Sequence, residues 1–263
     1  MNLFDTHAHL DSDQLVEQTP ELLADAKANS VGRILTVSTT LASCYRSLKL
    51  AEQHSMVYAA VGIHPCSCHQ ANLAQWKEIT TLINRPKVVA IGETGLDGYW
   101  DDCPMETQLE YFLRHIELSH ASGLPFIVHM RDCETRMMET LESALDDSGQ
   151  LNGVMHSFCG SKQAAQQCLD WGMYISFGGM VTFKKNDDLR AIAASIPDDR
   201  ILIETDAPFL SPHPHRSQRP NTPALIKHTL RCIADARGTP ADEFAKSTTE
   251  NALRLFRIDS IDD

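Results

Sequence analysis

Strand-like apolar stretches alternate with helix-like stretches from one end of the chain to the other. Short apolar runs rich in β-branched residues and bounded by turn residues are typical of buried strands. On this basis we expect eight strands, at residues 3–9, 34–39, 57–64, 88–93, 125–129, 153–157, 173–178 and 201–206.

The intervening segments predict helices at residues 21–30, 41–54, 73–84, 105–122, 134–146, 162–171 and 187–195, followed by two more at 222–237 and 241–256. Eight βα units indicate a parallel sheet covered by helices, and eight strands close a TIM (β/α)8 barrel. We therefore expect an α/β fold, a single domain over residues 1–263 with an additional C-terminal helix. The alternative is a doubly wound open sheet, although no Gly-x-Gly-x-x-Gly follows the first strand.

The composition fits this expectation and limits the classes of function that the protein could have. The 263 residues are 43% hydrophobic, enough for a large core, and no segment resembles a signal peptide or a membrane span. The formal charge of −12 argues against a broad nucleic-acid or membrane surface, although bound metals and local cations can hold phosphate. The eight cysteines are scattered, apart from Cys66 and Cys68, and lack zinc-ribbon pairing. We expect a cytoplasmic protein with reduced cysteines, no membrane partner and no stable protein partner.

The first predicted strand carries candidate metal ligands. It contains Asp5-Thr6-His7-Ala8-His9, in which His7 and His9 are two residues apart. Side chains at this spacing on a strand project to the same side. Two imidazoles that converge on one point, with carboxylates nearby, suit a divalent transition metal.

Other strands also end in residues that can bind metal. Glu93, His129, His156 and Asp206 fall at the ends of the fourth, fifth, sixth and eighth predicted strands. In a (β/α)8 barrel the carboxyl ends of the strands form the rim where active sites are built. Burying so many histidines and carboxylates there would be costly unless a metal paired them.

Six candidate ligands are too many for one catalytic ion that keeps an open position, and they predict two divalent cations. We expect His7 and His9 to hold one ion. His129 and His156 would hold the other, with Glu93 as the bridge. Asp206 would touch one of the two ions and face the bound water. Such a centre activates water for hydrolysis. Histidine-rich ligation suits Zn²⁺, Mn²⁺, Ni²⁺ or Fe²⁺, and a phosphate substrate would also allow Mg²⁺.

Asp206 is the natural general base, because a carboxylate beside the attacking water can take and return its proton. Glu93 shares in catalysis as the bridging ligand. Glu204 lies two residues before Asp206 and Asp5 two before His7. Each is expected either to support an imidazole or to be a polar strand residue bonded to its neighbours.

Several segments together resemble the TatD family of metal-dependent hydrolases. They are Asp5-Thr6-His7-Ala8-His9-Leu10-Asp11, Gly62-Ile63-His64-Pro65, Gly92-Glu93-Thr94-Gly95-Leu96-Asp97, His129-x-Arg131-Asp132, His156-Ser157-Phe158 and Glu204-Thr205-Asp206-Ala207-Pro208. The resemblance implies a TIM barrel of the amidohydrolase superfamily with two divalent cations. It also implies phosphodiester hydrolysis by a deoxyribonuclease or 3′–5′ exonuclease, with DNA or RNA as the nucleic-acid partner.

The sequence departs from the family pattern at three places. Cys133 stands where a small residue or Thr is usual, and Ser157 where Cys is usual. The segment 216–223 lacks the Arg-Gly-Lys-like run that tends to precede Asn-x-Pro in the family. The first two departures change no ligand, and the third concerns a loop expected to meet substrate.

A phosphodiester substrate needs cations and donors beyond the metals. We expect His64, Arg131, Lys184 and Arg216 to bind substrate. For Lys184, Arg216 and their neighbours Lys185 and Arg219, the alternative is a solvated loop face. For His64, the alternative is a structural histidine before Pro65.

Aromatic residues are also candidates for substrate contact. Tyr99, Trp100 and Phe183 lie in segments that follow predicted strands. They are expected either to stack on a nucleobase or to pack locally.

Two other functions fit the same residues. The first is a carbonyl-directed hydrolase on the same two-metal site, cleaving an ester, a lactone or aminoacyl-tRNA. The second is a metal-loaded barrel that only binds a ligand, against which the six intact ligands argue.

Overall fold

The computed structural model describes residues 2–259 and confirms the eight-stranded (β/α) architecture. Each strand pairs in parallel with the next along the chain, in the order β1 to β8. The strands are β1 Leu3–Ala8, β2 Val31–Val37, β3 Val57–Val61, β4 Val88–Asp97, β5 Phe126–Arg131, β6 Gly153–Met155, β7 Tyr174–Phe177 and β8 Ile201–Ile203.

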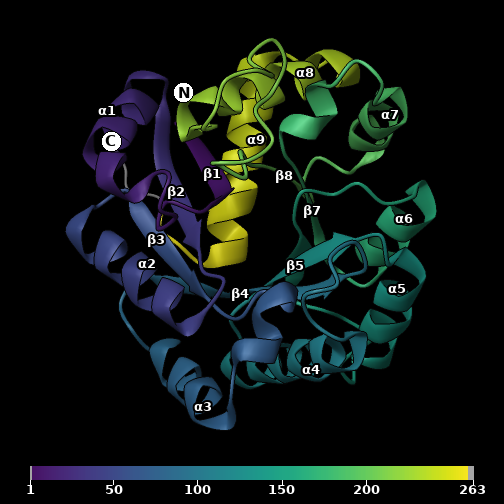
Figure 1. Cartoon of the computed structure of the whole chain (residues 1–263). Coiled ribbons are helices and arrows are strands. Elements are labelled where there is room, and N and C mark those ends of the chain that lie inside the picture. The colour runs from purple at the N-terminus through teal and green to yellow at the C-terminus, as the bar shows by residue number, and fades with distance from the viewer. Residues whose placement is uncertain (1, 260–263) are drawn as a thin grey trace.

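Helices surround the strands and connect most of them (Figure 1). The α-helices are α1 Thr19–Ala28, α2 Leu41–Gln53, α3 Leu73–Leu82, α4 Met105–Ser122, α5 Glu134–Ser143, α6 Lys162–Asp170, α7 Asp187–Ser195, α8 Ile226–Arg237 and α9 Ala241–Phe256. Short 3-10 helices cover Val16–Gln18, Pro65–Gln70, Gly179–Thr182 and Pro223–Leu225. No helix within residues 2–259 is long and apolar enough to cross a membrane.

The barrel has an apolar interior that α9 closes. One buried cluster combines residues of every strand, including Phe4, Val89 and Tyr174, with Leu255 and Phe256 of α9. The rings of Phe4 and Phe256 lie 5.8 Å apart. Because Phe4, Val89 and Tyr174 lie at or near the first residues of their strands, α9 covers the amino ends of the barrel. In Figure 1, α9 accordingly runs inside the ring of the other helices.

The first and last strands meet at their carboxyl ends. A parallel bridge joins Ala8 to Ala207, the His9 amide donates to the Ala207 carbonyl at 2.7 Å, and the Asp206 amide donates to the His7 carbonyl at 2.9 Å. Below these bonds, the Thr205 hydroxyl and amide donate to the Asp5 carboxylate at 2.6 and 2.9 Å. We call the contacts between β1 and the segment 203–207 the seam.

Several predicted elements differ in extent from the structure: β2 begins at Val31, and β3, β6 and β8 end at Val61, Met155 and Ile203, before the predicted residues 64, 157 and 206. Two other segments also differ. The fourth strand was expected to end at residue 93, but β4 continues to Asp97 because Gly95 and Asp97 pair with His129 and Arg131 of β5. Its polar, glycine-rich end has no apolar alternation that would mark it as strand. The helix expected at 222–237 divides into a 3-10 turn that begins at Pro223 and the separate α8.

Candidate metal centre

Six buried or nearly buried side chains converge at the carboxyl ends of the strands. They come from β1, β4, β5 and the segments that follow β6 and β8, and they are His7, His9, Glu93, His129, His156 and Asp206. Three sets of ligand atoms each lie within 4.8 Å of one another: His7, His156 and Asp206; His7, His9 and Glu93; and His64, Glu93 and His129. The barrel thus brings together all six residues that the sequence singled out as ligands.

Glu93 lies at the middle of this centre and divides the histidines into two pairs. Its Oε1 is 3.0 Å from His129 Nδ1 and 2.9 Å from His156 Nε2. Its Oε2 is 3.5 Å from His7 Nε2 and 3.6 Å from His9 Nε2. A carboxylate placed in this way can give one oxygen to each of two adjacent cations.

Three of the histidines are held from the side that faces away from Glu93. His9 Nδ1 lies 2.9 Å from the Val37 carbonyl, His129 Nε2 lies 2.8 Å from Asp97 Oδ2, and His156 Nδ1 lies 3.2 Å from Glu204 Oε1. An oxygen at one ring nitrogen fixes the hydrogen there and leaves the lone pair on the other nitrogen. In its neutral form each ring therefore presents a lone pair to the centre, and a bound cation would take the place of the second ring proton.

The donor set fits divalent cations, and one unpaired polar atom supports this. Glu93 Oε2 is buried without a hydrogen-bond partner among the described residues. His7 Nε2 also faces His9 Nε2 at only 3.3 Å. Buried polar groups in folded proteins are nearly always satisfied. A cation between these nitrogens and Glu93 would satisfy the carboxylate and turn the close approach of the rings into a favourable contact.

The electrostatics of the cluster keep its carboxylates charged. Burial alone would raise the pKa of Glu93, but the charge of His156 and the hydrogen bonds from His129 and His156 hold it well below its usual value. Burial likewise opposes protonation of His9, but Asp206 and Glu93 raise its pKa to about 9. The ionised carboxylates supply the negative charge that a divalent cation requires.

Asp206 is the most accessible carboxylate of the centre. Its Oδ1 lies 3.5 Å from His9 Nε2 and 3.9 Å from His7 Nε2, and its side chain retains 11% exposure. Burial would raise its pKa, but the hydrogen bond from His9 and the charges of His7 and His156 lower it. Asp206 is therefore an ionised carboxylate at the open side of the cluster.

Asp97 is a functional residue that the sequence reasoning did not single out. Its Oδ2 holds His129, and its Oδ1 accepts hydrogen bonds from the Tyr99 and Trp100 amides at 2.9 and 3.0 Å. Burial opposes its ionisation, but these bonds lower its pKa to about 2. The only available signal was its position at a strand end in the segment Gly-Leu-Asp.

Glu204 and Asp5 have different roles. Glu204 Oε1 faces His156 and accepts from the Ser157 amide at 2.7 Å, while Oε2 accepts from the Ser176 hydroxyl at 2.5 Å. Glu204 therefore supports an imidazole. The Asp5 carboxylate accepts hydrogen bonds from Thr205 and from the His7 amide, not from an imidazole. Asp5 therefore stabilises the seam.

The residues expected to bind substrate come from segments around the opening at the carboxyl ends of the strands, which we call the mouth. Only some of them adjoin the cluster. His64 Nδ1 accepts from the Cys66 amide at 3.1 Å, so Nε2 carries the hydrogen and points toward Glu93 Oε1 at 3.7 Å. The Arg131 guanidinium lies over the Tyr99 ring at 3.7 Å. Arg216 is exposed and lies 3.4 Å from the Phe183 ring centroid, and Lys184 is exposed in the segment after β7. His64 and Arg131 adjoin the cluster, whereas no contact joins Lys184 or Arg216 to it among the described side chains.

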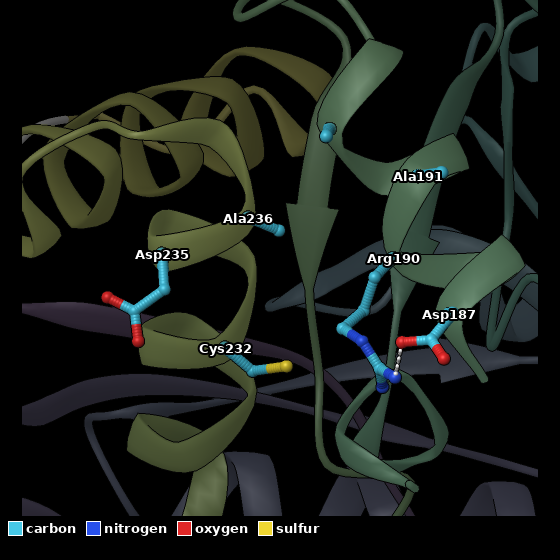
Figure 2. A pocket seen from close by; sticks show the side chains of 7 residues that line it. Asp187, Arg190, Ala191, Cys232, Asp235 and Ala236 are labelled. Atoms are coloured by element: carbon cyan, nitrogen blue, oxygen red, sulfur yellow. Dashed lines mark hydrogen bonds and ion pairs between the residues drawn. The ribbon is translucent and has the colours of Figure 1, made fainter. Parts of the chain in front are cut away.

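A separate pocket lies in the outer layer between α7 and α8 (Figure 2) and has a volume of about 450 Å³. The Arg190 guanidinium at its edge pairs with Asp187 and donates to the Val181 and Phe183 carbonyls. The Cys232 thiol donates to the same Val181 carbonyl. These polar groups are engaged in holding the segment after β7, so the pocket offers no chemistry comparable to that of the strand ends.

Comparison with known proteins identifies the family. Residues 4–257 match the model of the family described as TatD related DNase. The chain is 40% identical to the uncharacterized metal-dependent hydrolase YabD of Bacillus subtilis, covering 97% of this chain and 99% of that protein. It is 33% identical to the 3′-5′ ssDNA/RNA exonuclease TatD of Salmonella typhimurium, over 97% and 99% of the two chains. The crystal structure of YJJV, a TatD homologue from Escherichia coli K12, superimposes with a TM-score of 0.91 at 30% identity, covering 98% of each chain. The chain therefore belongs to the TatD family of metal-dependent hydrolases.

Proposed function

We propose that this hydrolase cleaves phosphodiester bonds in nucleic acid, as a divalent-metal-dependent deoxyribonuclease with 3′–5′ exonuclease activity. The observation that carries the proposal is Glu93, whose two oxygens each face a different pair of histidines. A ligand set that could hold two divalent cations is typical of many enzymes that cleave phosphate esters. The Salmonella relative, named an exonuclease for ssDNA and RNA, supports the same substrate class.

The ligands fall into two groups under this proposal. His7 and His9 with Glu93 Oε2 would hold one cation, and His129 and His156 with Glu93 Oε1 the other. Divalent cations bound there, Zn²⁺, Mn²⁺, Ni²⁺, Fe²⁺ or Mg²⁺, would supply Lewis acidity to the phosphoryl oxygen and to the attacking water. Asp206, ionised and on the open side, would accept the proton of that water and return it to the leaving oxygen.

The remaining polar groups at the mouth would bind the substrate phosphate. Burial lowers the pKa of His64 to about 3, so its imidazole is neutral and its Nε2–H is a donor, not a lone pair for a metal. Arg131 supplies a permanent positive charge in the same opening. Lys184 and Arg216 would contact a longer strand farther from the reacting phosphate.

The test is hydrolysis of an end-labelled single-stranded oligodeoxynucleotide with and without chelator. We expect turnover that requires an added divalent cation and releases mononucleotides from the 3′ end. His129→Ala should reduce kcat at least 100-fold, because it removes a candidate ligand. The matched control His120→Ala changes an exposed histidine of α4 and should leave kcat unchanged.

An ester and lactone panel, including aminoacyl-tRNA, is assayed in parallel. Turnover of carbonyl substrates alone, abolished by His129→Ala, would contradict the phosphodiesterase proposal and assign the centre to carbonyl hydrolysis.

A further inference from the structure

Two large aromatic side chains are exposed just after Asp97, the carboxylate that contacts the candidate ligand His129. Tyr99 and Trp100 follow the last residue of β4 and are 52% and 51% exposed. Their ring centroids lie 4.9 Å apart at an interplanar angle of 90°. Exposed large aromatic residues carry a free-energy cost in water and often mark a binding surface.

The aromatic pair is fixed to the centre through one carboxylate. Asp97 Oδ1 accepts from the Tyr99 and Trp100 amides, while Oδ2 faces His129 Nε2. The Gly98 amide also donates to the Arg131 carbonyl at 2.7 Å, and a Cβ at Gly98 would lie only 2.6 Å from the Asp132 carbonyl oxygen. This segment is therefore held tightly against the end of β5, which carries His129.

A positively charged side chain, that of Arg131, lies against this aromatic pair. The Arg131 guanidinium lies 3.7 Å from the Tyr99 ring centroid and 5.7 Å from that of Trp100. Within residues 2–259, Arg131 makes no ion pair with a carboxylate. An unpaired guanidinium on aromatic rings, in a protein of net charge −12, offers a local positive charge next to a flat apolar face.

From this arrangement we infer that Trp100, supported by Tyr99 and Arg131, forms a stacking platform for a nucleobase of single-stranded nucleic acid, adjacent to the phosphate at the metal centre. The inference rests on the proposed phosphodiesterase function and names how that substrate is held. A base can reach an aromatic face only when it is unstacked, so the platform selects single strands over duplex. Arg131 would contact the phosphate attached to the stacked nucleotide.

The opposite wall of the mouth is also aromatic. Phe209 follows β8, is 50% exposed and lies 5.9 Å from the His9 ring. In the strand order of the barrel, β8 lies across from β4. The centre is thus flanked by aromatic surface on two sides, as a strand passing through the mouth would require.

The experiment compares two oligonucleotides of equal length and charge, one with thymine bases and one abasic. Trp100→Ala should raise the KM for the base-bearing strand about tenfold, the effect of losing one stacked base. The KM for the abasic strand should change less than twofold. Trp100→Phe keeps a ring and should restore most of the difference between the two strands. Tyr45→Ala, which removes a 45% exposed ring from α2, is the matched control.

Binding is read separately from turnover by tryptophan fluorescence. In an Asp206→Asn background, which leaves the oligonucleotide intact, the base-bearing strand should quench emission and the abasic strand should not. Trp100→Ala should abolish the quenching, because Trp76 and Trp171 are partly buried.

The two proposals fail in different ways. If the wild-type enzyme hydrolyses neither oligonucleotide, the phosphodiesterase proposal is wrong, and the quenching titration alone decides the platform. If both strands are hydrolysed and Trp100→Ala changes their KM values equally, or neither strand quenches Trp100, the platform is wrong.

Discussion

At the scale of single residues, the orientation of a candidate ligand depends on the residue behind it, and Asp97 has this role for His129. A histidine or carboxylate at a strand end is visible in a sequence. Which nitrogen of His129 faces inward depends on Asp97, and nothing in the sequence separates Asp97 from the other carboxylates that follow strands. Asp5 is the opposite case. Its position two residues before His7 suggested an imidazole partner, but in the structure its carboxylate accepts a hydrogen bond from Thr205.

Asp97→Asn should weaken metal binding 10- to 100-fold, as loss of an orienting partner usually does. An amide nitrogen at Oδ2 would donate to His129 Nε2 and move the ring hydrogen to Nδ1. That nitrogen faces Glu93 and would lose its lone pair. Titration calorimetry with Zn²⁺ or Mn²⁺ measures the change.

The control for this variant is Asp102→Asn, which removes an exposed acid from the same connection between β4 and α4. Equal affinities for Asp97→Asn and the wild type would show that His129 is oriented by other contacts.

At the scale of secondary-structure elements, the apolar pattern predicted correctly where the strands and helices lie. It predicted the polar ends of the strands less well. Helices α4, α7 and α9 begin and end where the sequence predicted. Strand ends at the mouth carry polar residues by necessity, because the site is built there, and they interrupt the pattern. The continuation of β4 through Gly95 to Asp97 was missed for this reason.

Gly95→Ala should destabilise the protein by more than about 1 kcal/mol. Gly95 has a φ of +134°, and a Cβ there would lie 2.1 Å from the His129 carbonyl oxygen, so β4 and β5 would have to separate. Gly149→Ala is the matched control, since Gly149 also has a positive φ but nothing lies within 4 Å of its Cβ position. Urea unfolding should give a clearly lower midpoint for Gly95→Ala than for Gly149→Ala, and equal midpoints would contradict this account of the β4–β5 pairing.

At the scale of the whole molecule, the two ends of the barrel have separate tasks. The carboxyl ends carry the polar cluster, and the amino ends are closed by α9. The count of eight βα units was enough to predict the barrel. The sequence also predicted a helix at residues 241–256, but it could not show that this helix packs on the barrel interior beside Phe4.

Phe256→Ala should lower the free energy of unfolding by about 3–5 kcal/mol, the usual cost of removing a buried phenylalanine ring. Because the ring lies at the amino ends of the strands, the variant should bind the same amount of metal per chain as the wild type at temperatures where it stays folded. Thermal unfolding and metal analysis measure the two effects. Loss of metal from the folded variant would show that the two ends are coupled.

The seam also determines when the centre can exist during synthesis. Asp5 and Thr205 are 200 residues apart, and His7 and Asp206 belong to the same two segments. A growing chain carries His7 and His9 from the start and gains Glu93 with β4, but Asp206 joins them only after β8 has left the ribosome. The chain entropy lost in joining the two ends grows only logarithmically with the length between them. A chain released before β8 would therefore lack both the seam and Asp206.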